Sequence, residues 1–256
     1  MPGHRAPHVA VRLHGAPSST LDLFDRTFVL LVGPAGCGKT HVARSVAHAL
    51  GLQFESLSVG PETSKADLMG FVSPITSSYV ESAFFRAYTQ GGVFLIDEID
   101  AGNEAVLLQL NMALDSPVAS FGSKMYDRHP DFRVIAGANT HGNGADMRYV
   151  GRNRLDAATT NRFITLTMDY DHDLERELAG NDAWTAIVQE FRAACAECKL
   201  THVISPRQSI QGARLIAVGF STQDAAAATL TRGMKADEIA KVRAVLAPKT
   251  IKGVGL

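Results

Sequence analysis

The stretch Phe28-Val-Leu-Leu-Val-Gly-Pro-Ala-Gly-Cys-Gly-Lys-Thr40 decides the fold of this chain of 256 residues. It opens with an apolar run and then fits the pattern G-x-x-x-x-G-K-[ST] with Gly33, Gly38, Lys39 and Thr40. Apolar residues recur at helical spacing in the segment that follows, up to Leu50. The stretch therefore predicts a buried strand, a phosphate-binding loop and the N-terminus of a helix, in that order.

The residue types of this loop suit a nucleotide. Glycines let backbone N–H groups surround phosphate oxygens, and the dipole of the helix favours negative charge at its N-terminus. Lys39 can reach the β- and γ-phosphates, and the Thr40 hydroxyl can ligate Mg²⁺. A chance match has odds on the order of one in a hundred, so a plain glycine-rich turn is the weaker interpretation. We predict ATP and Mg²⁺ as cofactors, with contacts from Gly33, Pro34, Ala35, Gly36, Cys37, Gly38, Lys39, Thr40 and His41.

A second signal is the run Val93-Phe-Leu-Ile-Asp-Glu-Ile-Asp100. Its four apolar residues predict a central strand, and Asp97 and Glu98 follow at the carboxyl end, where open α/β sheets place their sites. Asp97 can hold Mg²⁺ through water, and Glu98 can polarise the attacking water. The alternative is a strand that merely ends in an acidic turn, which the upstream phosphate loop makes less favoured.

A further buried strand is predicted over Phe132-Arg-Val-Ile-Ala-Gly137, and Asn139 follows it. A polar residue at that strand tip is well placed to touch the attacking water or the γ-phosphate. We therefore expect Asn139 to belong to the same site as Lys39 and Glu98.

Composition limits the classes of protein. Apolar residues make up 46% of the chain, which is enough for a core, and the formal net charge is −1. This charge gives no global attraction to nucleic acid or anionic lipid. Three cysteines do not form a disulfide framework, and no apolar run approaches the roughly 20 residues needed to span a bilayer. We expect a soluble, cytoplasmic protein with no membrane partner.

The periodicity of the chain changes near Tyr170, and this change predicts its domain organisation. Residues 1–26 are predicted to be an irregular lead-in, and residues 27–170 an α/β core with hairpins near 70–80 and 117–131. Ordinary loops are the alternative to the hairpins. Helical periodicity then continues through residues 171–232, and residues 233–256 contain one more amphipathic helix and a tail.

Together these marks resemble the AAA+ ATPases, over about residues 20–220. Gly33–Thr40 looks like the Walker A loop, Asp97-Glu98 like Walker B, Asn139 like sensor 1, and Arg207 in Ile204-Ser-Pro-Arg207 like sensor 2. More narrowly, the chain is similar to the MoxR and dynein-related (AAA_5-type) branch, including the cobaltochelatase ATPase subunit and the Rubisco-activating MoxR-type ATPases. The features that indicate this branch are Asp67-Leu-Met-Gly70 before the first hairpin, the second hairpin, and Asn139, Leu155 and Asn161-Arg-Phe163.

The resemblance implies a P-loop NTPase fold, with a five-stranded parallel αβα sandwich and a small C-terminal helical lid. It also implies a homo-oligomeric ring, usually a hexamer, in which an arginine of the neighbouring subunit completes each site. Arg162 matches that arginine, although the family commonly has Asp-Arg-Phe where this chain has Asn161. The rivals for this role are Arg148, Arg152 and Arg154. Arg207 is implied to contact the γ-phosphate, and packing of its stem on the lid is the alternative.

These residues give three hypotheses for function. The first is a ring-forming ATPase that remodels a protein partner, for which the resemblance suggests a partner with a von Willebrand factor A domain. The second is a nucleic-acid translocase or helicase-like motor, for which the second hairpin offers Lys124, Arg128 and Arg133 and the first offers no cation after Lys65. The third is a nucleotide-dependent assembly switch with little turnover, which the intact Asp97-Glu98 pair argues against.

Two smaller clusters have more than one interpretation. Cys195, Cys198 and His202 lie on one helical face, but a structural zinc site needs four ligands, so we expect buried thiols. The hairpin aromatics could grip a threaded substrate or pack against their neighbours, and the sequence does not choose between these for Phe71, Tyr79, Phe121 and Tyr126.

Overall fold

A computed structural model describes residues 23–24, 27–142, 144–145 and 149–247. Most of the predicted lead-in, the end of the tail and Arg148 lie outside the described residues. The chain forms two compact units. The first contains the described residues up to Gly33 and from Gly38 to Met168, and the second contains Pro34–Cys37 and the described residues from Asp169 onward.

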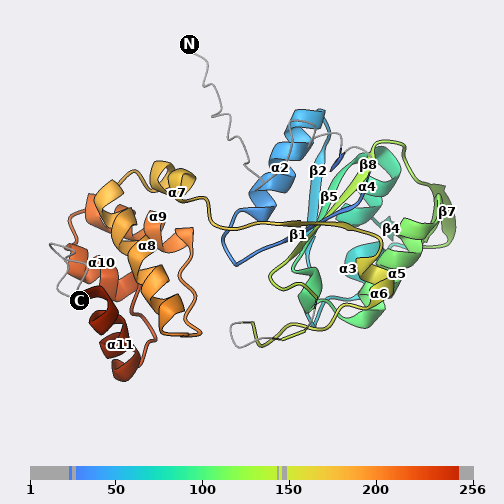
Figure 1. Ribbon diagram of the computed structural model, residues 1–256. Helices are drawn as coiled ribbons and strands as arrows, with labels where there is room; N and C mark the ends of the chain where they lie inside the picture. Colours follow the sequence, from blue (N-terminus) through green and yellow to red (C-terminus); the bar gives the residue numbers. More distant parts are fainter. Residues whose placement is uncertain (1–22, 25–26, 143, 146–148, 248–256) are drawn as a thin grey trace, which may run out of the picture. The chain divides into compact units, whose positions relative to one another are not determined.

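A parallel sheet of five strands forms the centre of the first unit (Figure 1). The strand order is β2-β5-β8-β1-β9. Its strands are β1 (Val29–Val32), β2 (Phe54–Ser58), β5 (Gly92–Asp97), β8 (Phe132–Ala138) and β9 (Ile164–Thr167). Because every pairing is parallel, the carboxyl ends of the strands meet at one edge of the sheet. The predicted fold class, a five-stranded P-loop αβα sandwich, is confirmed.

Helices cover the sheet, which explains why its inner strands are continuous apolar runs rather than alternating ones. Residues 92–96 of β5 are all buried. Phe84 on α4 makes aromatic contacts with Phe94 and Phe132 on the sheet, at centroid distances of 5.1 and 5.8 Å. The helical segments of this unit are α2 (Lys39–Leu50), α3 (Lys65–Met69), α4 (Ala83–Gln90), η1 (Ile99–Ala101), α5 (Glu104–Asp115) and α6 (Ala157–Thr160).

Two antiparallel hairpins project from this core. The first hairpin is β3 (Phe71–Val72) with β4 (Tyr79–Val80), and the second is β6 (Val118–Phe121) with β7 (Lys124–Asp127). The Phe85 ring on α4 lies 5.1, 5.0 and 5.0 Å from the rings of Tyr79, Phe121 and Tyr126. These three aromatics therefore pack against the core, whereas Phe71 is 47% exposed.

The second unit is helical in its described C-terminal part. Its helices are α7 (His172–Ala179), α8 (Asp182–Glu197), α9 (Pro206–Ala217), α10 (Thr222–Thr229) and α11 (Ala236–Leu246). Trp184 on α8 is buried against Gly212 on α9. Position 212 has room only for glycine, because a Cβ there would lie 2.1 Å from the indole. This arrangement fits the helical lid that was predicted. Within the described residues, no helix is both long enough and apolar enough to cross a membrane.

Candidate nucleotide-binding site

Lys39 joins two of the predicted motifs at the carboxyl edge of the sheet. β1 and β8 are adjacent, with Val32 in register with Ala138, so the residues after each strand lie close together. The Lys39 ammonium donates to the Gly33 carbonyl at 2.7 Å and to Oδ1 of Asn139 at 2.8 Å. Lys39 is 7% exposed, so its charge is held in place by these partners at the start of α2.

The N-terminus of α2 is suited to an anion. Gly38 precedes the helix with φ of 98°, a left-handed conformation that glycine adopts without strain. The first turn of α2 contains no acidic side chain that would repel a phosphate. The N–H groups of this turn and the Lys39 ammonium together offer the charge and the donors that phosphate oxygens require.

Thr40 and Asp97 face each other and fit a magnesium ion. The Thr40 hydroxyl donates to Oδ2 of Asp97 at 2.8 Å, and the backbone N–H of Glu98 donates to Oδ1 at 3.0 Å. Mg²⁺ prefers hard oxygen ligands, and it usually takes only one or two from the protein while phosphates and water supply the rest. Thr40 and Asp97 would hold the ion, which would supply charge neutralisation at the phosphates.

Gly137 gives Asp97 the space that this arrangement needs. A Cβ at position 137 would lie 2.6 Å from Oδ1 of Asp97, closer than two such atoms can approach. The strand next to the acidic one therefore has to lack a side chain at this point.

Glu98 stands in an uncommon backbone conformation directly after β5. Its φ of 58° lies in the left-handed region, which residues other than glycine seldom adopt. Its side chain is 45% exposed, and Oε1 lies 3.3 Å from Nη2 of Arg152. Such strain is typical of positions where a side chain must be presented to a ligand.

Asp100 is a member of the site that was not predicted from the sequence. Its carboxylate is fully buried, and Oδ2 accepts from the backbone N–H groups of Asn139 and Thr140 at 3.1 and 3.0 Å. It also accepts from the Thr140 hydroxyl at 2.9 Å. Asp100 thus fixes the backbone of Asn139, and its position in the acidic run after β5 was the available signal.

Arg162 lies away from these groups. It precedes β9, whose first residue, Ile164, pairs with the first residue of β1, so Arg162 stands at the edge where the strands begin. Its Nε donates to Oδ1 of Asp115 at 2.7 Å, and it also pairs with Oδ2 and with the Ala158 carbonyl. The hydrogen bond from Arg162 lowers the pKa of Asp115. Arg162 therefore lies at the edge of the sheet opposite to the one where Lys39, Asp97 and Asn139 meet.

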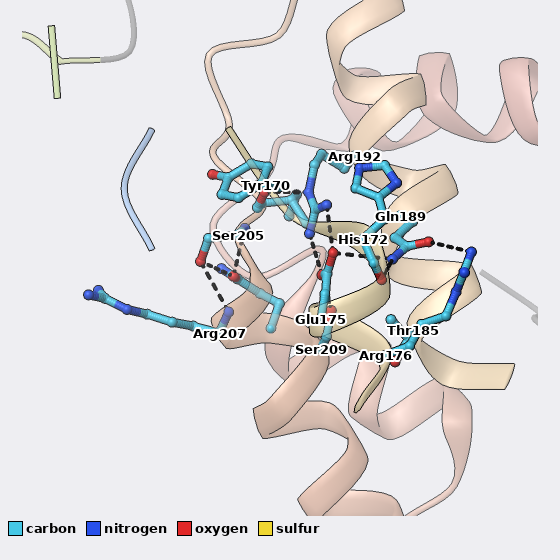
Figure 2. Close-up of polar contacts among 12 residues, drawn as sticks. Tyr170, His172, Glu175, Arg176, Thr185, Gln189, Arg192, Ser205, Arg207 and Ser209 are labelled. Carbon is cyan, nitrogen blue, oxygen red and sulfur yellow. Dashed lines mark hydrogen bonds and ion pairs between the residues drawn. The ribbon is translucent and has the colours of Figure 1, made fainter. Parts of the chain in front are cut away.

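In the second unit, Arg207 occupies the first turn of α9. Ser205 caps this helix, accepting from the backbone N–H of Arg207 at 3.3 Å, and Pro206 takes the first helical position. Figure 2 shows the Arg207 side chain extending away from the polar cluster beside it. In the same unit, Cys195 is buried in the helical core, and a ring nitrogen of His202 hydrogen-bonds the Leu230 carbonyl oxygen at 2.8 Å.

That cluster holds three helices together around Glu175 on α7. Glu175 accepts from Nη2 of Arg192 on α8 at 2.5 Å and from the Ser209 hydroxyl on α9 at 2.5 Å (Figure 2). Arg192 also donates to the Ile204 carbonyl at 2.8 Å and stacks on Tyr170, 4.4 Å from the ring centroid. The backbone just before Arg207 is thereby fixed by a buried ion pair.

Comparison with known proteins agrees with this geometry. Residues 28–163, more than half of the chain, match the family described as AAA domain (dynein-related subfamily). An uncharacterized protein of Staphylococcus epidermidis is 28% identical over 152 residues, which cover 56% of this chain and 55% of that protein. Midasin of Dictyostelium discoideum is 29% identical over 151 residues, covering 55% of this chain and 2% of midasin. The chain spans about half the length of the staphylococcal relative, and far less of midasin.

Solved structures show the same fold at low sequence identity. NtrX from Brucella abortus has a TM-score of 0.57 and 15% identity, over 82% of this chain and 47% of that one. A mutant of RuvB from Thermotoga maritima has a TM-score of 0.52 and 21% identity, over 89% of this chain and 65% of that one. With the family match over residues 28–163, the chain belongs to the dynein-related subfamily of AAA domains.

Proposed function

We propose that this chain is an ATP hydrolase that forms a homo-oligomeric ring, a hexamer, and uses hydrolysis to remodel or activate a protein partner, as MoxR-type ATPases do. The observation that carries the proposal is the meeting of Lys39, Asp97 and Asn139 at one sheet edge, with Glu98 beside them. Family membership supports nucleotide-dependent activity. A structure of NtrX with a TM-score of 0.55 to this chain contains ADP, which supports the choice of nucleotide.

In this mechanism each group of the first unit has one task. Lys39 and the N–H groups at the start of α2 bind the phosphates, and Thr40 and Asp97 hold Mg²⁺. Glu98 accepts a proton from the attacking water, and Asn139 orients that water or the γ-phosphate. Arg207 would contact the γ-phosphate from the lid.

In the proposed ring, an arginine of the neighbouring subunit supplies a further positive charge to each nucleotide site. Arg162 is turned to the opposite edge of the sheet from Lys39, which suits contact with a neighbouring subunit rather than with its own nucleotide. Its pairing with Asp115 would have to open or be shared on assembly. An arginine supplied in this way can be worth about 10³ to 10⁵ in rate.

A protein partner is favoured by the surface of the first hairpin. This hairpin exposes four apolar side chains, Phe71, Val72, Ile75 and Val80, with exposed fractions of 47, 49, 92 and 41%, and Phe71 and Val80 are cross-strand partners. Exposed apolar side chains that lie together indicate an interaction site. Of the cations predicted for the second hairpin, Arg128 donates to the Leu114 carbonyl, and Arg133 lies on β8 and donates to the Pro130 carbonyl, which leaves Lys124 exposed on β7. A partner with a von Willebrand factor A domain is our specific proposal.

The test is the ATP hydrolysis rate with two probes, an unfolded polypeptide and single-stranded DNA. We expect the polypeptide to raise the rate, and Ile75→Ser to lower the ratio of stimulated to unstimulated rate. Leu108→Ser, which removes another exposed apolar side chain on α5, is the matched control and should keep that ratio. Stimulation by DNA alone would favour the nucleic-acid motor, and ATP binding without turnover under any condition would favour the switch.

A further inference from the structure

Arg152 forms a bridge between two carboxylates of the acidic turn after β5. Its Nη2 lies 3.3 Å from Oε1 of Glu98, and its Nη1 donates to Oδ1 of Asp100 at 3.2 Å. The Arg152 side chain is 12% exposed, so the guanidinium is largely withdrawn from water. A guanidinium offers several N–H donors in one rigid plane, so it can hold two carboxylates at a fixed separation.

The segment that carries Arg152 is docked on the same turn through its backbone. The backbone N–H of Asn153 donates to the Asp100 carbonyl at 2.6 Å, and its side-chain amide donates to the Gly102 carbonyl at 3.0 Å. Arg152 is therefore held in place by its own main chain, within its own subunit.

Asp100 extends this bridge to Asn139. One oxygen of the buried Asp100 carboxylate faces Arg152, and the other accepts from the backbone N–H of Asn139 at 3.1 Å. Burial of a carboxylate is costly unless hydrogen-bond donors and a cation compensate for the lost water, and Arg152 supplies a cation here. Movement of Arg152 would thus disturb Glu98 and Asn139 together.

We infer that Arg152 is a positioning residue that acts in cis, holding Glu98 by one carboxylate oxygen so that the other is presented to the attacking water. The inference rests on the proposed ATP hydrolysis and assigns Arg152 a role different from an arginine supplied to a neighbouring subunit. Nη2 of Arg152 contacts Glu98 and Nη1 contacts Asp100, and both carboxylates belong to the same subunit as Arg152. Through Asp100 it keeps Glu98 and Asn139 in a common geometry.

The first experiment measures kcat and KM for ATP separately in variants of Arg152. Arg152→Met should lower kcat about 10- to 100-fold, because misplacement of a reacting group by about 1 Å can cost 10²-fold, while KM for ATP stays within about twofold. Arg152→Lys keeps a cation beside Asp100 and should fold like the wild type, yet it lacks the planar fork, so its kcat should fall at least about fivefold. Arg86→Met, which removes an arginine–glutamate pair between α4 and β2, is the matched control and should keep kcat.

The second experiment distinguishes action in cis from action in trans. Arg152→Met or Arg152→Lys is mixed with Glu98→Gln. If Arg152 and Glu98 act in the same subunit, every site in the mixture lacks one of the two residues. We expect the mixture to hydrolyse ATP no faster than the average of the two variants. Recovery of activity on mixing, or a folded Arg152→Lys with wild-type kcat, would overturn the inference. If the wild type itself does not hydrolyse ATP, the proposed function fails instead, so the two failures are distinct.

Discussion

Single residues decide whether the carboxylates of this site can be placed at all. Gly137 faces Asp97, Gly38 allows the turn into α2, and Glu98 accepts a left-handed backbone. Each of these features puts a polar group where a nucleotide or its ion would lie. The chemistry of the site therefore depends on backbone positions as much as on the residues that touch ATP.

We predict that Gly137→Ala impairs the magnesium-dependent step. The new Cβ would lie 2.6 Å from Oδ1 of Asp97, so the carboxylate or the strand has to shift. Overpacking of this kind typically costs about 1–3 kcal/mol of stability. We expect a raised Mg²⁺ requirement for hydrolysis, measured by titrating the ion at fixed ATP. Gly60→Ala is the control, because nothing lies within 4 Å of its added Cβ, and an unchanged requirement in Gly137→Ala would contradict the account.

At the scale of single residues, a local pattern in the sequence predicts a contact only when the two residues lie close together along the chain. The loop from Gly33 to Thr40 and the Asp97-Glu98 pair could be found because each motif is local and has a fixed spacing. The contact of Arg152 with Asp100 joins residues 52 positions apart, and no local pattern indicates it. Asp100 was visible as an acidic residue, but its burial depends on the tertiary fold.

At the scale of elements, the inner strands were predictable because buried parallel strands are continuous apolar runs. Strand β5 begins at Gly92 and was expected from Val93, and β8 was expected to end at Gly137 and continues to Ala138. The hairpins offered no such signal for their aromatics. Phe121 and Tyr126 pack on Phe85, a contact that depends on how the second hairpin lies on α4.

The helices of the second unit depend on Glu175, and we predict a pH-dependent stability for this reason. Burial raises the pKa of Glu175, but hydrogen bonds from Arg192 and Ser209 outweigh this effect and leave it below the usual 4.5. A lowered pKa in the folded state gives stability that is present above the unfolded pKa and is lost as pH falls through the folded value. The loss should therefore appear below pH 4.5.

Glu175→Gln checks this expectation. Removing one charge of a buried pair leaves Arg192 uncompensated and should lower the free energy of unfolding by about 3–5 kcal/mol at pH 7. The difference from the wild type should shrink below pH 4.5, measured by thermal melting across pH. A difference that stays constant across this range would show that Glu175 acts by packing alone.

At the scale of the whole molecule, the proposed ring requires subunits that complete one another. Arg162 stands at the edge of the sheet opposite Lys39, so its proposed task lies in a neighbouring subunit. We predict that Arg162→Ala and Glu98→Gln are each inactive alone and regain activity when mixed. A mixed ring would contain sites with Glu98 from one subunit and Arg162 from the next. Specific activity should also rise with protein concentration.

The result that would count against this assembly is specific. If Arg162→Ala hydrolyses ATP like the wild type, and activity per subunit does not change with concentration, Arg162 has no part in a shared site. The pairing of Arg162 with Asp115 would then be its whole role.

The most direct measurement is ATP binding and steady-state hydrolysis by the wild type and by Glu98→Gln, with Mg²⁺ present. We predict that the wild type hydrolyses ATP, and that Glu98→Gln binds ATP with a similar Kd while its kcat falls by about 10²-fold or more, since a positioned general base is worth about 10² to 10⁴. A wild type that binds ATP without turnover, or a Glu98→Gln variant that hydrolyses at the wild-type rate, would contradict the claim that this sheet edge is a hydrolytic site.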